Sequence, residues 1–273
     1  MGRNLPRPAA PQPGRWAIRS PPRWPLTRTP EPADRRTASR SGPGPSLWDT
    51  SVVSGSRANE YHPAFEEYCE AIWELREDDI EVIQARIAER IEVSRPAVSE
   101  MIRRMEDEGL VEVNSSIRLT AKGRSLAERV VRRHRLAERF LTDMLGLSWA
   151  YAHAEAGKWE HIISEPVEQA LTRVLGDPTT CPHGNPIPGA DYTAPVTQPL
   201  SEIGVGERFT ISRIPEELEF TPGLLDFLEE NSLLPGHNGV LVAMSPDGTA
   251  TVEVDGHSVG IGSFASERIL VAG

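Results

Sequence analysis

Apolar positions from Pro63 onward recur every three or four residues, and this spacing predicts an amphipathic helix. The apolar stripe of the helix is formed by Phe65, Tyr68, Ile72 and Leu75. The other side is acidic and is expected to face solvent, with Glu67, Glu70 and Glu74. Glu67 and Glu70 are three residues apart and can also lean toward one cation.

Residues 80–114 have the pattern of a helix-turn-helix. A first helix is predicted over residues 82–91, with an inward side formed by Ile83, Ile87, Ala88 and Ile91. A second helix begins after Ser94, because Ser94 is a favourable N-cap and Pro96 is tolerated in a first turn. This helix buries Val98, Ile102 and Met105 and ends at Gly109. Its exposed N-terminal part suits entry into a DNA major groove and comprises Ser94, Arg95, Pro96, Ala97, Ser99, Glu100 and Arg103.

A wing is predicted next, from two short apolar strands over residues 110–113 and 117–119. Thr120 then caps a long helix over residues 121–145. Between Ile83 and Arg139 there are thirteen basic and nine acidic residues, in a chain whose formal net charge is -11. This local positive balance favours a face that contacts DNA phosphates. The alternative is a winged helix that makes only protein contacts.

Two further helices, predicted over residues 148–163 and 164–175, carry more apolar surface than they can cover alone. A homodimer would cover it, and a twofold dimer also suits paired DNA half-sites. After a loop rich in Pro and Gly at residues 177–195, a helix is predicted over 223–231. Five short strands are predicted over 208–214, 239–244, 249–254, 257–261 and 269–271, and they suggest a small SH3-like β-barrel.

These elements predict a mainly α protein with a C-terminal β domain. Its expected parts are a disordered Arg/Pro-rich tail (1–56), an N-terminal winged helix-turn-helix (57–125), a helical metal-binding and dimerisation domain (126–190) and an SH3-like domain (191–273). The tail holds nine Arg and eleven of the 24 Pro residues, a composition that cannot bury enough surface to order itself. The alternative for the tail is a basic arm that touches DNA.

Composition excludes several classes of protein. Cys69 and Cys181 are the two cysteines of the chain, so it can form neither a disulfide framework nor a cysteine zinc cage. No apolar run approaches the roughly 18 residues of a membrane span, and we expect a cytoplasmic protein without a membrane partner. No nucleophile stands beside a partnered base, so neither an enzyme nor a small organic substrate is expected.

Histidine and carboxylate residues gather between residues 132 and 164. His134 and Glu138 are four residues apart, which places them on one helix face where they can close on one ion. His153 precedes Glu160 and His161 by about two helical turns. Imidazole with carboxylate suits a divalent first-row metal. The alternative is a solvated face of ion pairs, with counter-charges from Arg132, Arg133, Arg135, Arg139 and Lys158. Cys181 and His183 have no further ligand nearby in the sequence and are interpreted as part of a structural loop.

Five segments together resemble a known family: YCEAIWEL, QARIAERIEVSRPAVSEMIRRMEDEGLV, RRHRLAERFLTD, KWEHIISEPVE and HGNPIPG. The chain strongly resembles the diphtheria toxin repressor family over residues 63–189, and its C-terminal part resembles the family's SH3-like domain more weakly. The resemblance implies a homodimer that binds double-stranded operator DNA when loaded with Fe(II) or Mn(II), and that represses metal-uptake genes.

The resemblance also implies metal ligands. One family site matches His134, Glu138 and His153, and the other matches Glu67, the Gly157 carbonyl, Glu160 and His161. Iron-responsive members typically have Met at the position of Glu67 and Cys at that of Gly157, whereas manganese regulators have carboxylates matching Glu67 and Glu70. Oxygen donors favour the harder ion, so Mn(II) is favoured, with Fe(II) as the alternative and Zn(II), Co(II) or Ni(II) as substitutes in vitro. The C-terminal ligands of the iron regulators fall near Thr221 and Leu224.

Three functions therefore compete. A metal-switched repressor needs a cation to join Glu67 on the leading helix to Glu160 and His161. A constitutive winged-helix regulator would use the same acids only as ion pairs. A metallohydrolase is disfavoured, because the pair Glu160 and His161 lacks the two histidines four residues apart of the zinc-protease pattern.

Overall fold

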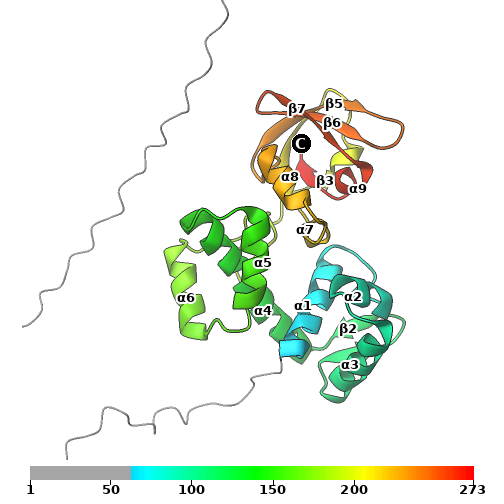
Figure 1. Ribbon diagram of the computed structural model, residues 1–273, viewed down its shortest axis with the longest axis vertical. Helices are drawn as coiled ribbons and strands as arrows, with labels where there is room; N and C mark the ends of the chain where they lie inside the picture. The colour runs from blue at the N-terminus through cyan, green and yellow to red at the C-terminus, as the bar shows by residue number, and fades with distance from the viewer. Residues whose placement is uncertain (1–62) are drawn as a thin grey trace, which may run out of the picture. The chain divides into compact units, whose positions relative to one another are not determined.

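The computed structural model describes residues 63–273, and the predicted tail over 1–56 lies outside them (Figure 1). The N-terminal elements are α1 (Pro63–Glu77), α2 (Gln84–Arg90), α3 (Arg95–Asp107), β1 (Val111–Val113) and β2 (Ile117–Leu119). Ser94 caps α3 by accepting a hydrogen bond from the backbone N–H of Ala97 at 3.4 Å. The inward residues of α3, which are Val98, Ile102 and Met105, are at most 2% exposed. The predicted winged helix-turn-helix is therefore confirmed.

Two predictions about individual faces are wrong. Ile83 is 37% exposed, because it precedes α2 in extended backbone and does not share the inward face of the helix. Glu70 and Glu74 are buried at 9% and 5% exposure, although they were predicted to face solvent. The acidic side of α1 is covered from the direction of α4 and α2, where His134 and Arg90 meet it.

A long helix, α4 (Ala121–Arg139), connects the winged helix to the next group of helices. Its N-cap is Thr120, as predicted, whose hydroxyl accepts a hydrogen bond from the backbone N–H of Gly123 at 3.2 Å. A Cβ atom at Gly123 would lie 2.0 Å from the carbonyl oxygen of Leu110, so only glycine allows α4 to approach the wing this closely. The helix was predicted to reach residue 145, but its last turn is the π-helix η2 (Phe140–Met144).

Helices α5 (Trp149–Trp159) and α6 (Glu165–Val174) follow. Ala137, Leu141, Ala152, Ala156, Ile163 and Leu171 form the buried core that joins them to the end of α4 and to η2. Trp149, at the start of α5, is buried in the core of the C-terminal sheet domain, and its backbone N–H donates to Glu229 at 2.9 Å. Helix α5 thus packs against α4 in one core and contributes Trp149 to the core of the C-terminal sheet domain.

The C-terminal part is a six-stranded antiparallel sheet in the order β3-β8-β4-β5-β6-β7. Its strands are β3 (Gln198–Pro199), β4 (Arg208–Arg213), β5 (Asn238–Met244), β6 (Ala250–Val254), β7 (His257–Ile261) and β8 (Leu270–Ala272). The short helices are η3 (Leu200–Glu202), α7 (Glu216–Glu219), α8 (Leu224–Glu230) and α9 (Ser263–Ser266). Five strands were predicted, and β3 was missed because its two residues carry no pattern. The sheet is not a closed barrel, and it remains compatible with an SH3-like fold.

No helix within residues 63–273 is both long and apolar enough to cross a membrane.

Candidate metal centre

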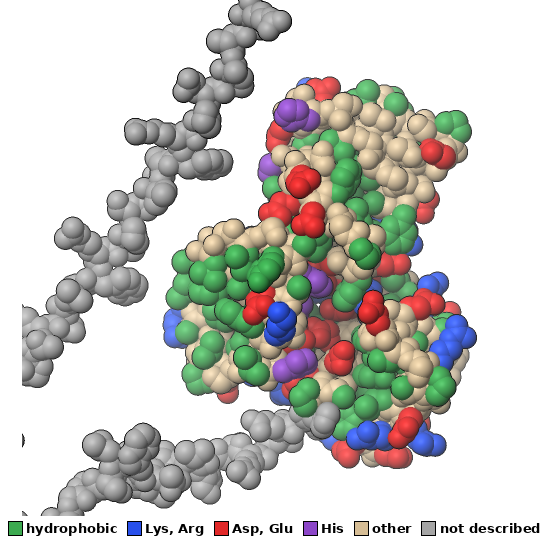
Figure 2. Space-filling view, viewed as in Figure 1, with side chains coloured by type: hydrophobic (Ala, Val, Ile, Leu, Met, Phe, Trp, Pro, Cys, Tyr) green, Lys and Arg blue, Asp and Glu red, His purple; other side chains and the backbone are tan. Residues whose placement is uncertain are grey.

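A hollow of about 250 Å³ lies where α1, α4 and α5 meet, with α2 and the residue after α7 at its edge. Figure 2 shows histidine and acidic side chains gathered around it. The hollow contains seven of the eight predicted metal ligands: Glu67, Glu70, His134, His153, Gly157, Glu160 and His161. The eighth, Glu138, lies behind His134 and His153 at 0% exposure. The structure therefore brings the predicted residues into one region.

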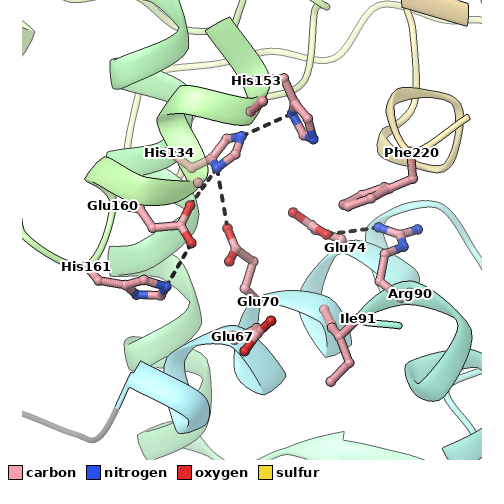
Figure 3. Close-up of a pocket in the computed structure, with 13 residues that line it drawn as sticks. Glu67, Glu70, Glu74, Arg90, Ile91, His134, His153, Glu160, His161 and Phe220 are labelled. Carbon is pink, nitrogen blue, oxygen red and sulfur yellow. Dashed lines mark hydrogen bonds and ion pairs between the residues drawn. The ribbon is translucent and has the colours of Figure 1, made fainter. Parts of the chain in front are cut away.

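The first donor cluster consists of Glu70, His134 and Glu160, whose ligand atoms all lie within 4.8 Å of one another. Nδ1 of His134 is 2.6 Å from Oε2 of Glu160 and 3.9 Å from Oε1 of Glu70. Figure 3 shows Glu70 pointing from α1 toward the other two side chains. Burial, together with the charges of Glu160 and Glu74, raises the pKa of Glu70 well above its ordinary value. The cluster therefore resists holding all its negative charge without a cation.

Glu67 and His161 lie beside this cluster. Nε2 of His161 is 3.1 Å from Oε1 of Glu160, while its Nδ1 is 2.8 Å from Oε2 of Glu66. Glu66 was not predicted as part of the site, and its only signal in the sequence is its position next to Glu67. Glu67 is exposed and lines the hollow, and a Cβ at Gly157 would meet nothing within 4 Å. There is therefore open space around both Glu67 and Gly157.

The second cluster is built by His134, Glu138 and His153. Oε1 of Glu138 lies 3.3 Å from Nε2 of His134 and 3.0 Å from Nδ1 of His153. Burial opposes ionisation of Glu138, but the imidazoles of His183 and His134 hold the pKa of its carboxyl well below the ordinary value. Burial also lowers the pKa of His153, but Glu138 and Glu219 outweigh it and raise that pKa to about 10. Without a metal, protons therefore balance the negative charge of this cluster.

The C-terminal domain contributes a carboxylate that the sequence did not reveal. Oε2 of Glu219, in α7, is 3.1 Å from Nδ1 of His153 and 2.9 Å from Nδ1 of His183. Glu219 lies two residues before Thr221, near the expected positions Thr221 and Leu224, whose own side chains carry no carboxylate, imidazole or thiol. The acidic run at Glu216–Glu219 is the signal that could have indicated α7.

Cys181 and His183 have a potential further ligand close in space, although none is near them in the sequence. Both side chains are 0% exposed, and they form a donor cluster with Glu138, which α4 supplies. Nδ1 of His183 is 3.8 Å from the Cys181 sulfur and 3.6 Å from Oε1 of Glu138. Fold topology, and not sequence proximity, joins this loop to the site.

The alternative of a face held by basic counter-charges does not match the contacts. Arg132 and Arg133 pair with Glu168, and Arg135 pairs with Glu77 and Glu216. Arg139 pairs with Asp143, and Lys158 pairs with Glu155. Within residues 63–273, no Lys or Arg pairs with Glu70, Glu138 or Glu160, whose charged partners are all histidines. The basic residues of this stretch are therefore used elsewhere.

One edge of the hollow is closed by an aromatic residue. The guanidinium of Arg90 lies 4.7 Å from the centre of the Phe220 ring and pairs with Glu74 at 2.9 Å (Figure 3). The Phe220 ring also meets His153 edge-on, with 5.4 Å between ring centres. The helix-turn-helix and the C-terminal domain thus both contact the rim of the site.

The residues predicted to contact DNA lie together at the N-terminal end of α3. All seven are exposed: Ser94, Arg95, Pro96, Ala97, Ser99, Glu100 and Arg103. Arg95, Glu100 and Arg103 have no ion pair in the part of the chain that the structure describes. Their charges are therefore available to a partner.

The iron-dependent repressor IdeR of Mycobacterium tuberculosis is 39% identical to this chain over 212 aligned residues, in a match that covers 73% of this chain and 92% of the relative. The chain belongs to the diphtheria toxin repressor family. Two family models match it: the N-terminal DNA binding domain of iron dependent repressors at residues 61–116, and their metal binding and dimerisation domain at residues 120–189.

Other members of the diphtheria toxin repressor family are also similar. The diphtheria toxin repressor of Corynebacterium diphtheriae is 48% identical over 143 residues, covering 52% of this chain and 59% of that protein. The solved structure of a manganese-dependent transcriptional repressor in complex with manganese has a TM-score of 0.69 and 33% identity, and the match covers 76% of this chain and 99% of that one.

These findings confirm the family and the class of function. The chain is a metal-dependent transcriptional repressor of the diphtheria toxin repressor family, and not an enzyme. Its two matched domains indicate a homodimer that binds DNA.

Proposed function

We propose that the protein is a Mn(II)-responsive repressor of metal-ion uptake genes, which binds its operator as a homodimer. The observation that carries the proposal is the cluster of Glu70, His134 and Glu160, in which two carboxylates from distant helices converge on one imidazole. Glu67, the Gly157 carbonyl and His161 complete this site in the proposal. Oxygen donors predominate there, and they favour Mn(II) over softer ions.

Two buried oxygens support the assignment of a cation to this region. Oε1 of Glu70 and Oε2 of Glu138 are buried without a hydrogen-bond partner in the described part of the chain. An unsatisfied buried carboxylate oxygen is costly, and a metal ion is one of the few groups that removes the cost. The residues present therefore fit a divalent cation at either of the two clusters, which share His134.

The second site of the proposal uses His134, Glu138 and His153, with Glu219 and His183 close enough to take part. Cys181 adds a sulfur donor beside Glu138. A sulfur donor suits Fe(II) better than the harder Mn(II), so this cluster favours the second candidate, an Fe(II)-responsive repressor of iron uptake. The relatives include proteins named for each metal.

The switch follows from where the ligands are attached. Glu70 is on α1, which leads directly into the helix-turn-helix, whereas Glu160 closes α5 and His134 is on α4. A divalent cation held by Glu70, His134 and Glu160 would supply the positive charge that offsets the two carboxylates. These carboxylates repel one another when both are ionised, so that α1 is free to move away from α4 and α5. Holding the two together fixes α1, and with it α3, for DNA binding. The population shift is limited by the difference in metal affinity between the two arrangements.

A dimer interface is proposed over η2, α5 and α6. Large apolar side chains remain exposed there: Met144, Leu145, Tyr151, Ile162, Val167 and Val174. Ile162 is 77% exposed, and Figure 2 shows hydrophobic side chains gathered over this part of the molecule. A contiguous apolar surface of this kind marks a protein interface. A twofold dimer would place two copies of α3 at the spacing of operator half-sites.

Operator binding by purified protein tests the proposal. Fluorescence anisotropy of labelled promoter DNA is followed while Mn(II), anaerobic Fe(II) or Zn(II) is added to chelator-treated protein. Mn(II) is expected to strengthen binding, and Glu160→Ala or His161→Ala is expected to abolish the gain. Glu253→Gln, an exposed carboxylate on β6, is the matched control and keeps the response. Binding that is indifferent to chelator would leave a constitutive DNA-binding protein, and a stronger response to Fe(II) would favour the iron-responsive candidate.

A further inference from the structure

A second cavity, of about 220 Å³, lies on the winged helix between α1, β2 and α4. Its apolar walls are Ile72 and Trp73 of α1 with Ile117 and Leu119 of β2. None of its residues belongs to the proposed metal clusters or to the predicted DNA-contacting end of α3. The cavity is therefore a separate feature of the fold, and its use does not depend on which metal the protein binds.

The charge around this cavity is positive and unmatched. Arg76, Arg118 and Arg124 line it from three different elements, and none of them has an ion pair within residues 63–273. Glu77, its one acidic lining residue, already pairs with Arg135 at 2.5 Å and with Arg213 at 3.2 Å. Three free guanidinium groups around one concave surface concentrate a positive field there and attract anions.

The shape and chemistry of the walls select among anions. The guanidinium of Arg124 lies 5.8 Å from the centre of the Trp73 ring, so that a charged group and an aromatic face stand side by side. Ile117 is 4% exposed and Ile72 is 1% exposed, which makes the floor of the cavity apolar. An apolar cavity of about 150 Å³ is enough to hold a benzene ring. This cavity has room for such a ring and an acidic group.

We propose that this cavity binds a small organic anion, with an apolar or aromatic body against Trp73 and a carboxylate or phosphate held by Arg118 and Arg124. The planar guanidinium groups match either acid through paired N–H donors. The molecule is a ligand and not a substrate, since the one carboxylate that lines the cavity, Glu77, is held in ion pairs with Arg135 and Arg213. A DNA phosphate has the same charge, but it has no apolar body to fill the space between Trp73 and Ile117.

Isothermal titration of the full chain with benzoate, phenyl phosphate, inorganic phosphate and benzamide tests this proposal. Benzoate or phenyl phosphate is expected to bind, and the tighter of the two identifies the acidic group. Benzamide, which lacks the charge, and inorganic phosphate, which lacks the ring, are each expected to bind at least about tenfold more weakly. Quenching of tryptophan fluorescence by the bound ring, lost in Trp73→Phe, locates the site.

The double variant Arg118→Ala/Arg124→Ala is expected to weaken benzoate or phenyl phosphate binding at least about tenfold. Arg208→Ala, an exposed arginine at the start of β4, is the matched control and keeps wild-type affinity. The proposal is overturned if neither aromatic acid binds, if benzamide binds as tightly, or if Arg208→Ala loses as much affinity. It is also overturned if the double variant loses only operator affinity, since the arginines would then be DNA phosphate contacts. Metal titration of the same variants reports separately on the proposed repressor function.

Discussion

Replacing Glu70 with glutamine tests whether Glu70 is a metal ligand or only a structural partner of His134. The two carboxylates of the first cluster have ligand atoms within 4.8 Å of each other and of His134. Two unit charges at that separation repel by about 3.5 kcal/mol at an effective dielectric constant of about 20. Burial, together with this repulsion, raises the pKa of Glu70 and so favours its protonated form in the metal-free protein. Glutamine imitates the protonated acid, so Glu70→Gln is expected to change the free energy of unfolding of the metal-free protein by less than about 1 kcal/mol.

The metal-loaded protein responds differently. At a Mn(II) concentration about 100 times the dissociation constant, binding stabilises the native state by about 2.7 kcal/mol. If loss of the Glu70 carboxylate lowers the affinity for Mn(II) about 100-fold, binding at the same Mn(II) concentration stabilises the native state by only about 0.4 kcal/mol. With roughly 2–4 °C per kcal/mol for a chain of this size, the Mn(II)-induced rise in Tm falls from about 5–10 °C to about 1–2 °C.

Thermal unfolding with and without Mn(II), compared between wild type, Glu70→Gln and Glu253→Gln, measures both effects. Because the folded-state pKa of Glu70 is raised, the metal-free wild type loses stability as pH rises above the ordinary carboxyl value of 4.5, and Glu70→Gln removes that contribution. A variant that keeps the wild-type response to Mn(II) would refute the assignment of Glu70 as a ligand. So would a metal-free variant that unfolds several degrees below Glu253→Gln, since Glu70 would then be a structural partner of His134.

Three further outcomes are expected. The pKa of His153 is about 10 in the metal-free state, so a metal must displace its proton at neutral pH. Mn(II) affinity, measured by titration between pH 6.5 and 7.5, should therefore rise about tenfold per pH unit for each proton displaced. An affinity that does not change with pH would remove His153 from the ligands. Ile162→Asp, at a position 77% exposed in one chain, is expected to convert the dimer to a monomer in sedimentation and to weaken operator binding, with Val242→Asp, 46% exposed on β5, as control. Deletion of residues 1–52 is expected to leave operator affinity unchanged in anisotropy titrations, and a large loss would indicate a basic arm that touches DNA.

Local elements of this protein follow from the sequence alone. Ser94 and Thr120 were predicted as caps, and both side chains accept a backbone hydrogen bond at the start of α3 and α4. The period of Val98, Ile102 and Met105 placed the inward face of α3 correctly. Such features depend on neighbours within about four residues, so a pattern in the chain is enough to reveal them.

The composition of the metal centre was decided by tertiary structure. Glu70 is buried because α4 covers the polar side of α1. The apolar stripe of α1 indicates one buried side of the helix, but it does not indicate whether a second side is also covered. Glu219 reaches His153 and His183 because α7 lies against α5 and the loop before the sheet, although 66 residues separate Glu219 from His153 along the chain. Spacing within one helix indicates which side chains share a face. Which carboxylates from other elements meet them is set by the packing of the whole domain, because packing carries no period along the chain.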